Sequence, residues 1–203
     1  MDIGARLESV APVTAAAQAR ALAAAGLAAL LVVALVVAGR ADGAGTAWNV
    51  YLAPTSACRS ADDSGAPAAA QVRAVTCLVN WARAHDSRKR LVRRPALQLA
   101  ATLKGERVAS CGQFSHTPCG SAVTAAVHAA GYRYATFGEN LFAGTWGHVS
   151  ARDVVSAWLQ SPEHRANILG PRFKDLGAAP VRAHGLLDGG DAVVWTATFG
   201  SRQ

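Results

Sequence analysis

An uncharged apolar run at residues 21–38 limits what this chain can fold into more than any other feature, because it separates a short leader from the rest. Its 18 residues, at about 1.5 Å each in a helix, nearly cross a hydrocarbon core about 30 Å thick. We predict a single transmembrane helix that stays as a signal-anchor, with residues 1–20 as a cytoplasmic leader. The alternative is a signal peptide cleaved near residues 37–41, which would leave a secreted protein.

All four cysteines follow this run, and an even number of cysteines after an export signal predicts two disulfides in a domain outside the cytoplasm. They are Cys58, Cys77, Cys111 and Cys119. Three pairings can be drawn. Pairing Cys58 with Cys77 and Cys111 with Cys119 closes the shorter loops. Zinc binding is less favoured because no C-x-x-C spacing occurs.

The positive charge of the chain is concentrated in one segment. Residues 71–110 hold nine Lys or Arg and two Asp or Glu, which equals the formal charge of +7 of the whole chain. The densest part is residues 88–94. A solvated loop is the simpler interpretation, and contact with an anionic lipid or polymer is the alternative. We predict no nucleic-acid partner, because no aromatic residues are interleaved with these arginines.

Composition and periodicity divide the remainder into a linker and one domain. Residues 39–69 are rich in small and turn-forming residues and predict a linker, interrupted by an apolar patch at residues 48–52. That patch either docks on the domain or lies at the membrane interface. The domain is predicted to occupy residues 70–203.

Within the domain, helical patterns precede strand patterns. Helices are expected at residues 67–85, 95–108, 121–131, 151–160 and 162–169, and an antiparallel hairpin at residues 176–183 and 191–199. Ser161 is a good N-cap and Pro162 suits the first helical position. Because no regular βαβ alternation occurs, the fold class is α+β.

Three short motifs place ionisable side chains in an otherwise apolar region. They are FSHTP at 114–118, GEN at 138–140 and SPEHRANIL at 161–169. Such side chains are expensive to bury without partners, so the motifs predict a shared polar site. Glu139, which lies between aromatic residues, most needs a cation, a hydrogen-bond donor or a raised pKa.

The order of these motifs resembles the CAP superfamily of cysteine-rich secretory, antigen 5 and pathogenesis-related proteins, in particular its bacterial branch. Other matching landmarks are LVN at 78–80, PAL at 95–97 and AGY at 130–132. The similarity covers roughly residues 70–200. It implies an α-β-α sandwich with a small antiparallel sheet between helices, here preceded by the predicted transmembrane helix.

The resemblance also implies a cleft in which two histidines and two glutamates hold a divalent metal such as zinc or calcium. The residues carried over are His116, Glu139, Glu163 and His164. Many relatives have the second glutamate three residues after the Trp of the fourth helix, where this chain has Ser161, so Glu163 is the proposed substitute. Asn140 and Asn167 are expected to support the site by binding buried backbone.

Two functions follow from this interpretation. The first is a binding module that recognises a lipid, an envelope polymer or another protein through the His/Glu cleft. The alternative is a metal-dependent, peptidase-like hydrolase, in which a metal-bound water attacks and Glu163 acts as base. No catalytic residue is assigned, because neither H-E-x-x-H nor G-x-S-x-G occurs.

Overall fold

The computed structural model describes residues 6–14, by their backbone, and residues 48–203. The predicted transmembrane helix at residues 21–38 lies outside these ranges. Within them, no helix is both long enough and apolar enough to span a bilayer.

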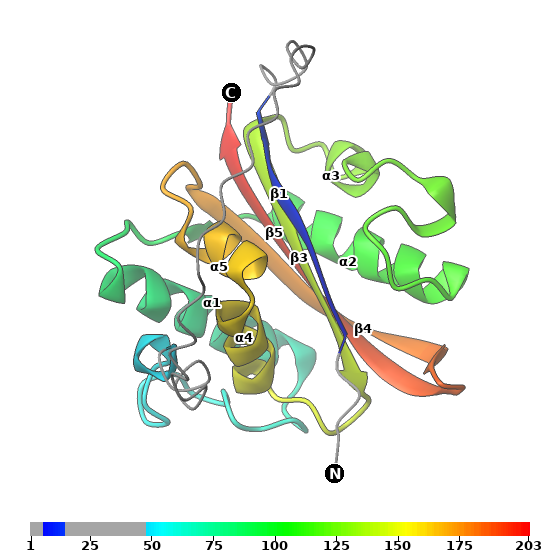
Figure 1. Ribbon diagram of the computed structural model, residues 1–203, viewed down its shortest axis with the longest axis horizontal. Coiled ribbons are helices and arrows are strands. Elements are labelled where there is room, and N and C mark those ends of the chain that lie inside the picture. Colours follow the sequence, from blue (N-terminus) through cyan, green and yellow to red (C-terminus); the bar gives the residue numbers. More distant parts are fainter. Residues whose placement is uncertain (1–5, 15–47) are drawn as a thin grey trace, which may run out of the picture.

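A twisted sheet of five strands forms the middle of the fold, in the order β1-β3-β5-β4-β2 (Figure 1). The strands are β1 (Arg6–Thr14), β2 (Val92–Arg93), β3 (Tyr134–Thr145), β4 (Asp175–Leu187) and β5 (Gly190–Arg202). All neighbours are antiparallel except β2 and β4, which are parallel. The predicted hairpin is confirmed as β4 and β5, which are longer than the apolar pattern indicated.

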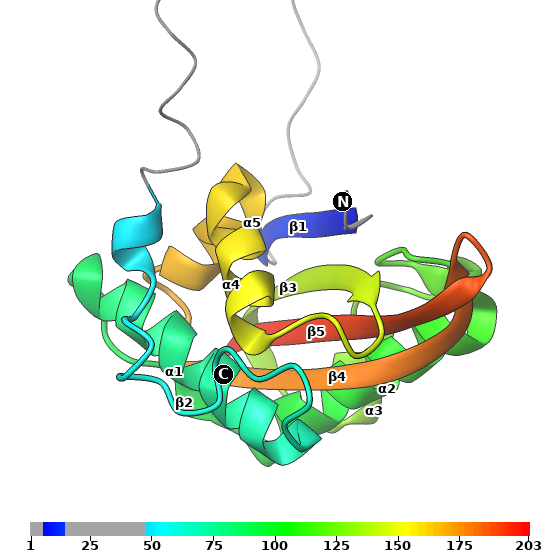
Figure 2. The same cartoon turned by 90° about the horizontal axis from the view of Figure 1, so that it is seen from below.

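Helices cover both faces of this sheet, so the predicted α+β class is confirmed. They are α1 (Ala68–His85), α2 (Pro95–Cys111), α3 (Ala125–Ala129), α4 (Ala151–Gln160) and α5 (Pro162–Leu169), with 3-10 turns η1 (Asn49–Tyr51) and η2 (Pro118–Gly120). Figure 2 shows α4 and α5 over one face and α2 and α3 over the other.

The main core lies between α1, α4, α5 and the sheet. Leu78, Trp158, Trp195 and Phe199 are completely buried there. A smaller core packs α2 and α3 against the opposite face. The backbone of α2 approaches β4 so closely that a Cβ built at Gly177 would lie 2.1 Å from the carbonyl carbon of Leu97. Only glycine fits at this crossing.

Local signals explain most helix boundaries. Ser150 accepts a hydrogen bond from the N–H of Asp153, whose carboxylate accepts from the N–H of Ser150, which is a complete capping box for α4. The predicted third helix is shorter than expected, because only residues 125–129 are helical and the turn η2 precedes them. Cys119 in that turn has a φ of 51° and is tied to Cys111, which restricts the backbone there.

The structure differs from the predicted linker over residues 48–66. Ala53 and Ala61 are 1% exposed and belong to the main core, and Cys58 forms a disulfide with Cys77 of α1. The apolar patch docks on the domain, where Trp48 lies 3.7 Å from the guanidinium of Arg165. Small residues therefore reflect close packing here rather than flexibility.

The strand β1 falls in the predicted leader, for which the sequence indicated no regular structure. It pairs along the outer edge of β3. A segment paired in this way lies on the same side of a membrane as the domain. Pairing and a cytoplasmic location of residues 6–14 are therefore alternatives, and the location of the leader stays a prediction.

Candidate functional site

Glu139, in the middle of β3, is completely buried. Its Oε1 lies 2.7 Å from His116 Nδ1 and 3.1 Å from Lys104 Nζ. These three side chains form what we call the Glu139 cluster. A buried carboxylate needs a compensating positive charge, and Lys104 supplies this cation to Glu139.

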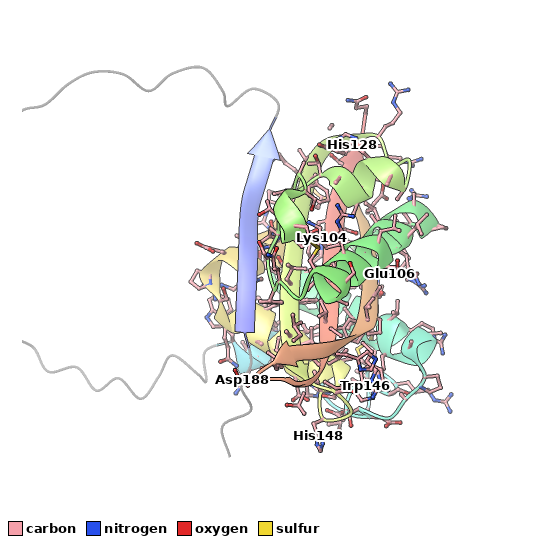
Figure 3. The ribbon with its side chains drawn as sticks, turned by 90° about the vertical axis from the view of Figure 1, so that its right-hand side faces the viewer. Lys104, Glu106, His128, Trp146, His148 and Asp188 are labelled. Atoms are coloured by element: carbon pink, nitrogen blue, oxygen red, sulfur yellow. A yellow bond between two sulfur atoms is a disulfide. The ribbon has the colours of Figure 1, made fainter. Side chains whose placement is uncertain are left out.

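Lys104 is the member of the Glu139 cluster that was not among the predicted site residues. Its side chain is 2% exposed, and its ammonium donates to the carbonyl oxygens of His116, at 2.5 Å, and Val123, at 3.3 Å. Figure 3 labels Lys104 on α2 beside β3, and Glu106 of the same helix is exposed. The helical spacing of the sequence does indicate that Lys104 is buried. The buried positions of α2 form one continuous stripe that includes this lysine; they are 97, 100, 101, 104, 105 and 108.

The loop that carries His116 is fixed at both ends. The Cys111–Cys119 disulfide closes it, and the N–H of Cys119 donates to Gln113 Oε1. Both disulfides therefore join the cysteines that close the shorter loops, and the predicted disulfide bonds are confirmed.

His164 lies on the helix α5, which meets the opposite face of β3 from α2. Its Nδ1 is 2.7 Å from the hydroxyl of Ser161, so this hydroxyl contacts the imidazole instead of capping the helix. The backbone carbonyl of His164 accepts from Asn140 Nδ2 at 3.0 Å. Consecutive strand residues point to opposite faces, which explains why Asn140 contacts α5 while Glu139 contacts α2.

The asparagines connect α5 to β3. Asn167 Nδ2 donates to Asn140 Oδ1 at 2.8 Å and to the carbonyl of Glu139 at 3.3 Å. Both therefore bind buried polar groups, the role expected of them. The close approach depends on Gly138, since a Cβ built there would lie 2.8 Å from Asn167 Oδ1. The motif G-E-N thus combines a close contact, a buried charge and an inter-element hydrogen bond.

The four residues expected to share one cleft are only partly brought together. His116 and Glu139 are in direct contact, His164 is held by Ser161 on the α5 side, and Glu163 is exposed on α5. Across residues 48–203, whose side chains the structure describes, no three His, Cys, Asp or Glu side chains gather closely enough to hold a metal ion.

A divalent metal does not fit the Glu139 cluster, because the ammonium of Lys104 already lies 3.1 Å from the carboxylate oxygen that a metal would need. Like charges at such a distance repel strongly where water is excluded. Metal binding by His116, Glu139, His164 and Glu163 stays a prediction for titration, and the position of Lys104 speaks against it.

The strand β1 runs past this site. In its register, Val10 lies opposite Glu139 and Ser9 opposite Asn140. The edge of β3 that carries both site residues is therefore occupied by a nine-residue extended segment of the same chain.

Comparison with known proteins gives a consistent result. The sequence model of the cysteine-rich secretory protein family, CAP, matches residues 76–199. The uncharacterized protein YkwD of Bacillus subtilis (strain 168) is 29% identical over 150 residues, which cover 72% of this chain and 54% of YkwD. The chain thus spans about half the length of this relative.

Solved structures share the fold at low sequence identity. An outer surface protein from Borrelia burgdorferi has a TM-score of 0.55 and 18% identity, over 66% of this chain and 93% of that one. An extracellular protein with an SCP domain from Bacillus anthracis str. Ames has a TM-score of 0.56 and 18% identity, over 67% of this chain and 41% of that one. These similarities support the α+β architecture.

Proposed function

Because this chain belongs to the cysteine-rich secretory protein family, we propose that it is an extracytoplasmic binding module that holds an extended segment of another protein along the edge of β3. The domain is tethered to the cell membrane through residues 21–38. Two disulfides suit an oxidising compartment, and the structural relatives include an outer surface protein and an extracellular protein.

The pairing of β1 with β3 is the observation that carries this proposal. In this pairing the β3 edge accepts an extended backbone over Arg6–Thr14, in register with Glu139 and Asn140. Addition of a strand to an exposed sheet edge is a common way to bind a peptide, because main-chain hydrogen bonds supply affinity and alternate side chains supply specificity.

Membrane insertion explains why the natural occupant is another protein. If residues 21–38 span the bilayer, residues 6–14 lie on the other side and cannot pair with β3 of the same chain. Cleavage after the apolar run has the same consequence. An unpaired edge readily recruits another strand, so the edge is then available to a partner.

The geometry favours binding over hydrolysis. The carboxylate of Glu139 is neutralised by Lys104 inside the protein, and Glu163, the candidate base, is exposed on α5. A general base must reach the proton that it abstracts, and no metal site forms among the described residues beside Glu163.

Amide hydrogen exchange of the full chain in lipid nanodiscs tests the proposal. The probe is a peptide with the sequence of residues 6–14, and the readout is exchange of the β3 amides, residues 134–145. We expect the peptide to slow exchange in β3 while leaving α1 unchanged. A control peptide with Val10→Pro lacks an N–H opposite Glu139 and should protect β3 less.

Two results would contradict the proposal. One is β3 exchange that does not respond to a saturating concentration of the peptide. The other is full protection of β3 before any peptide is added, since the edge would then already be filled.

A further inference from the structure

A hollow of about 820 Å³ lies away from the Glu139 cluster, between the loop that follows α1 and the ends of β4 and β5. A second hollow of about 550 Å³ adjoins it and shares Arg94, Arg202 and Gln203 with it. The two hollows therefore border on the same three residues, and we call the pair the basic groove. Besides the buried Arg83, its cationic side chains are Arg88, Lys89, Arg90, Arg94, Arg133, Lys174 and Arg202, all of which reach solvent.

Most of this positive charge has no internal counter-charge. Asp175 is the acidic side chain in the lining, and it is 2% exposed and paired with Arg94 and Arg202 at 2.8 and 3.5 Å. Arg88 pairs with Asp86 at 2.9 Å. In the part of the chain that the structure describes, the remaining four form no ion pair; they are Lys89, Arg90, Arg133 and Lys174.

The floor of the groove is rigid because Arg83 ties its two walls together. This side chain is 1% exposed and donates to the carbonyl oxygens of Lys89, Ile168, Gly170 and Phe173, at 2.7 to 3.4 Å. Burial and the neighbouring charge of Arg88 lower the pKa of Arg83 to about 10.

The basic loop is also fixed at its far end. Asn80 of α1 holds Leu91 through two hydrogen bonds. Its Nδ2 donates to the carbonyl oxygen of Leu91 at 3.1 Å, and its Oδ1 accepts from the N–H of Leu91 at 2.7 Å. The N–H of Val92 then donates to the carbonyl of Lys174 at 2.9 Å, which joins β2 to β4. A merely solvated loop would not need these buried contacts. Because these contacts fix the backbone of the loop, less backbone freedom is lost when a ligand binds to its side chains.

We propose that the basic groove binds a linear polyanion that carries repeated phosphate groups. Five of the seven cations that reach solvent are arginines, whose planar guanidinium groups bind phosphate oxygens in a bidentate manner. Two adjoining hollows suit a chain that crosses both, whereas the charges of a bilayer surface lie in a plane that a concave groove does not follow.

The lining argues against a nucleic acid as that polymer. Its aromatic side chains are Phe173 and Tyr132, which are only 3% and 5% exposed. Proteins that bind single-stranded nucleic acids stack bases on exposed aromatic rings. The groove therefore recognises the phosphates and offers no platform for bases.

Calorimetric titration of the full chain, in a mild nonionic detergent, with inorganic polyphosphate of defined length tests the assignment. The variant Arg90→Glu with Lys174→Glu reverses one unpaired charge on each wall. We expect its affinity to fall about tenfold or more, and the slope of log affinity against log salt to become shallower by about two. The matched control, Arg59→Glu with Arg73→Glu, makes the same change of net charge at exposed positions outside the groove and should lose less than about threefold.

Each comparison can overturn the proposal. Equal losses in the two variants would show that only net charge matters. Equal affinity for polyglutamate of the same charge would reject phosphate recognition, and tighter binding to single-stranded DNA would reject the exclusion of nucleic acids. Stronger binding to nanodiscs with anionic lipids than to polyphosphate would assign the groove to the membrane instead.

Discussion

The Glu139 cluster and the basic groove both depend on cationic side chains, but they use them in opposite ways. Lys104 is 2% exposed, and its ammonium forms an ion pair with Glu139 and hydrogen bonds with two carbonyl oxygens. Lys174, in contrast, is exposed at the groove and, in the described ranges, forms no ion pair. Charge in the first region stabilises the fold, and charge in the second remains available to a ligand.

The largest expected effect tests the internal role of Lys104. We expect Lys104→Met to lower the free energy of unfolding by about 3–5 kcal/mol, because it leaves Glu139 buried without its cation. Urea denaturation measures the change. Lys174→Met, which removes an exposed charge of the same kind, should stay within about 0.5 kcal/mol of wild type.

A double variant distinguishes charge compensation from packing. Adding Glu139→Gln to Lys104→Met removes the uncompensated carboxylate and should recover part of the loss. If Lys104→Met alone costs less than about 1 kcal/mol, Glu139 does not depend on the ammonium and the comparison between the two regions fails.

A smaller effect is expected from the disulfide that closes the His116 loop. Removing it with Cys111→Ala and Cys119→Ala should lower stability by about 2.5 kcal/mol, the value for a loop with a sequence separation of 8. The corresponding change at Cys58 and Cys77, with a separation of 19, should cost about 3 kcal/mol. Denaturation curves under non-reducing conditions compare the two.

This disulfide also separates the two regions functionally. The Cys111–Cys119 loop carries His116 and does not line the basic groove. Polyphosphate affinity of the folded variant should therefore match that of wild type. A large loss of affinity would mean that the Glu139 cluster and the groove are coupled and do not act independently.

Features encoded locally were predictable from the sequence. The capping box at Ser150, Pro95 and Pro162 at first helical positions, and the turn after Leu187 set element boundaries through short-range chemistry. The family motifs also located Glu139 and both histidines.

Features set by tertiary packing were not predictable in the same way. The strand β3 is buried on both faces and contains Gly138, Glu139 and Asn140, so it shows neither the alternation of an exposed strand nor a continuous apolar run. Lys104 was overlooked because a lysine in a helix is usually solvated, and only its partner Glu139, 35 positions away in the sequence, makes its burial tolerable.

The smallest predicted effect concerns Tyr132, a buried residue that lines the basic groove and binds the buried carboxylate of Asp175. Its hydroxyl donates to Asp175 Oδ2 at 2.9 Å, while Arg94 Nε binds the other oxygen at 2.8 Å. Tyr132→Phe removes one of these bonds and leaves the ion pair, so we expect a loss of about 1 kcal/mol near neutral pH. Polyphosphate binding should hardly change, because Arg94 keeps its position.

The alkaline pH dependence gives this prediction a specific signature. Burial and the hydrogen bond to Asp175 raise the pKa of Tyr132 well above its ordinary value. Above about pH 10 the folded chain therefore retains a proton that the unfolded chain has lost, and stability falls as the pH rises.

The lowered pKa of Arg83, about 10, acts with the opposite sign, because there the unfolded chain binds the extra proton. Since both variants share Arg83, the difference between wild type and Tyr132→Phe in urea denaturation from about pH 8 to 11 isolates the tyrosine. This difference in the free energy of unfolding should shrink above about pH 10. A difference that stays constant would mean that Asp175 does not hold the phenol in its protonated form.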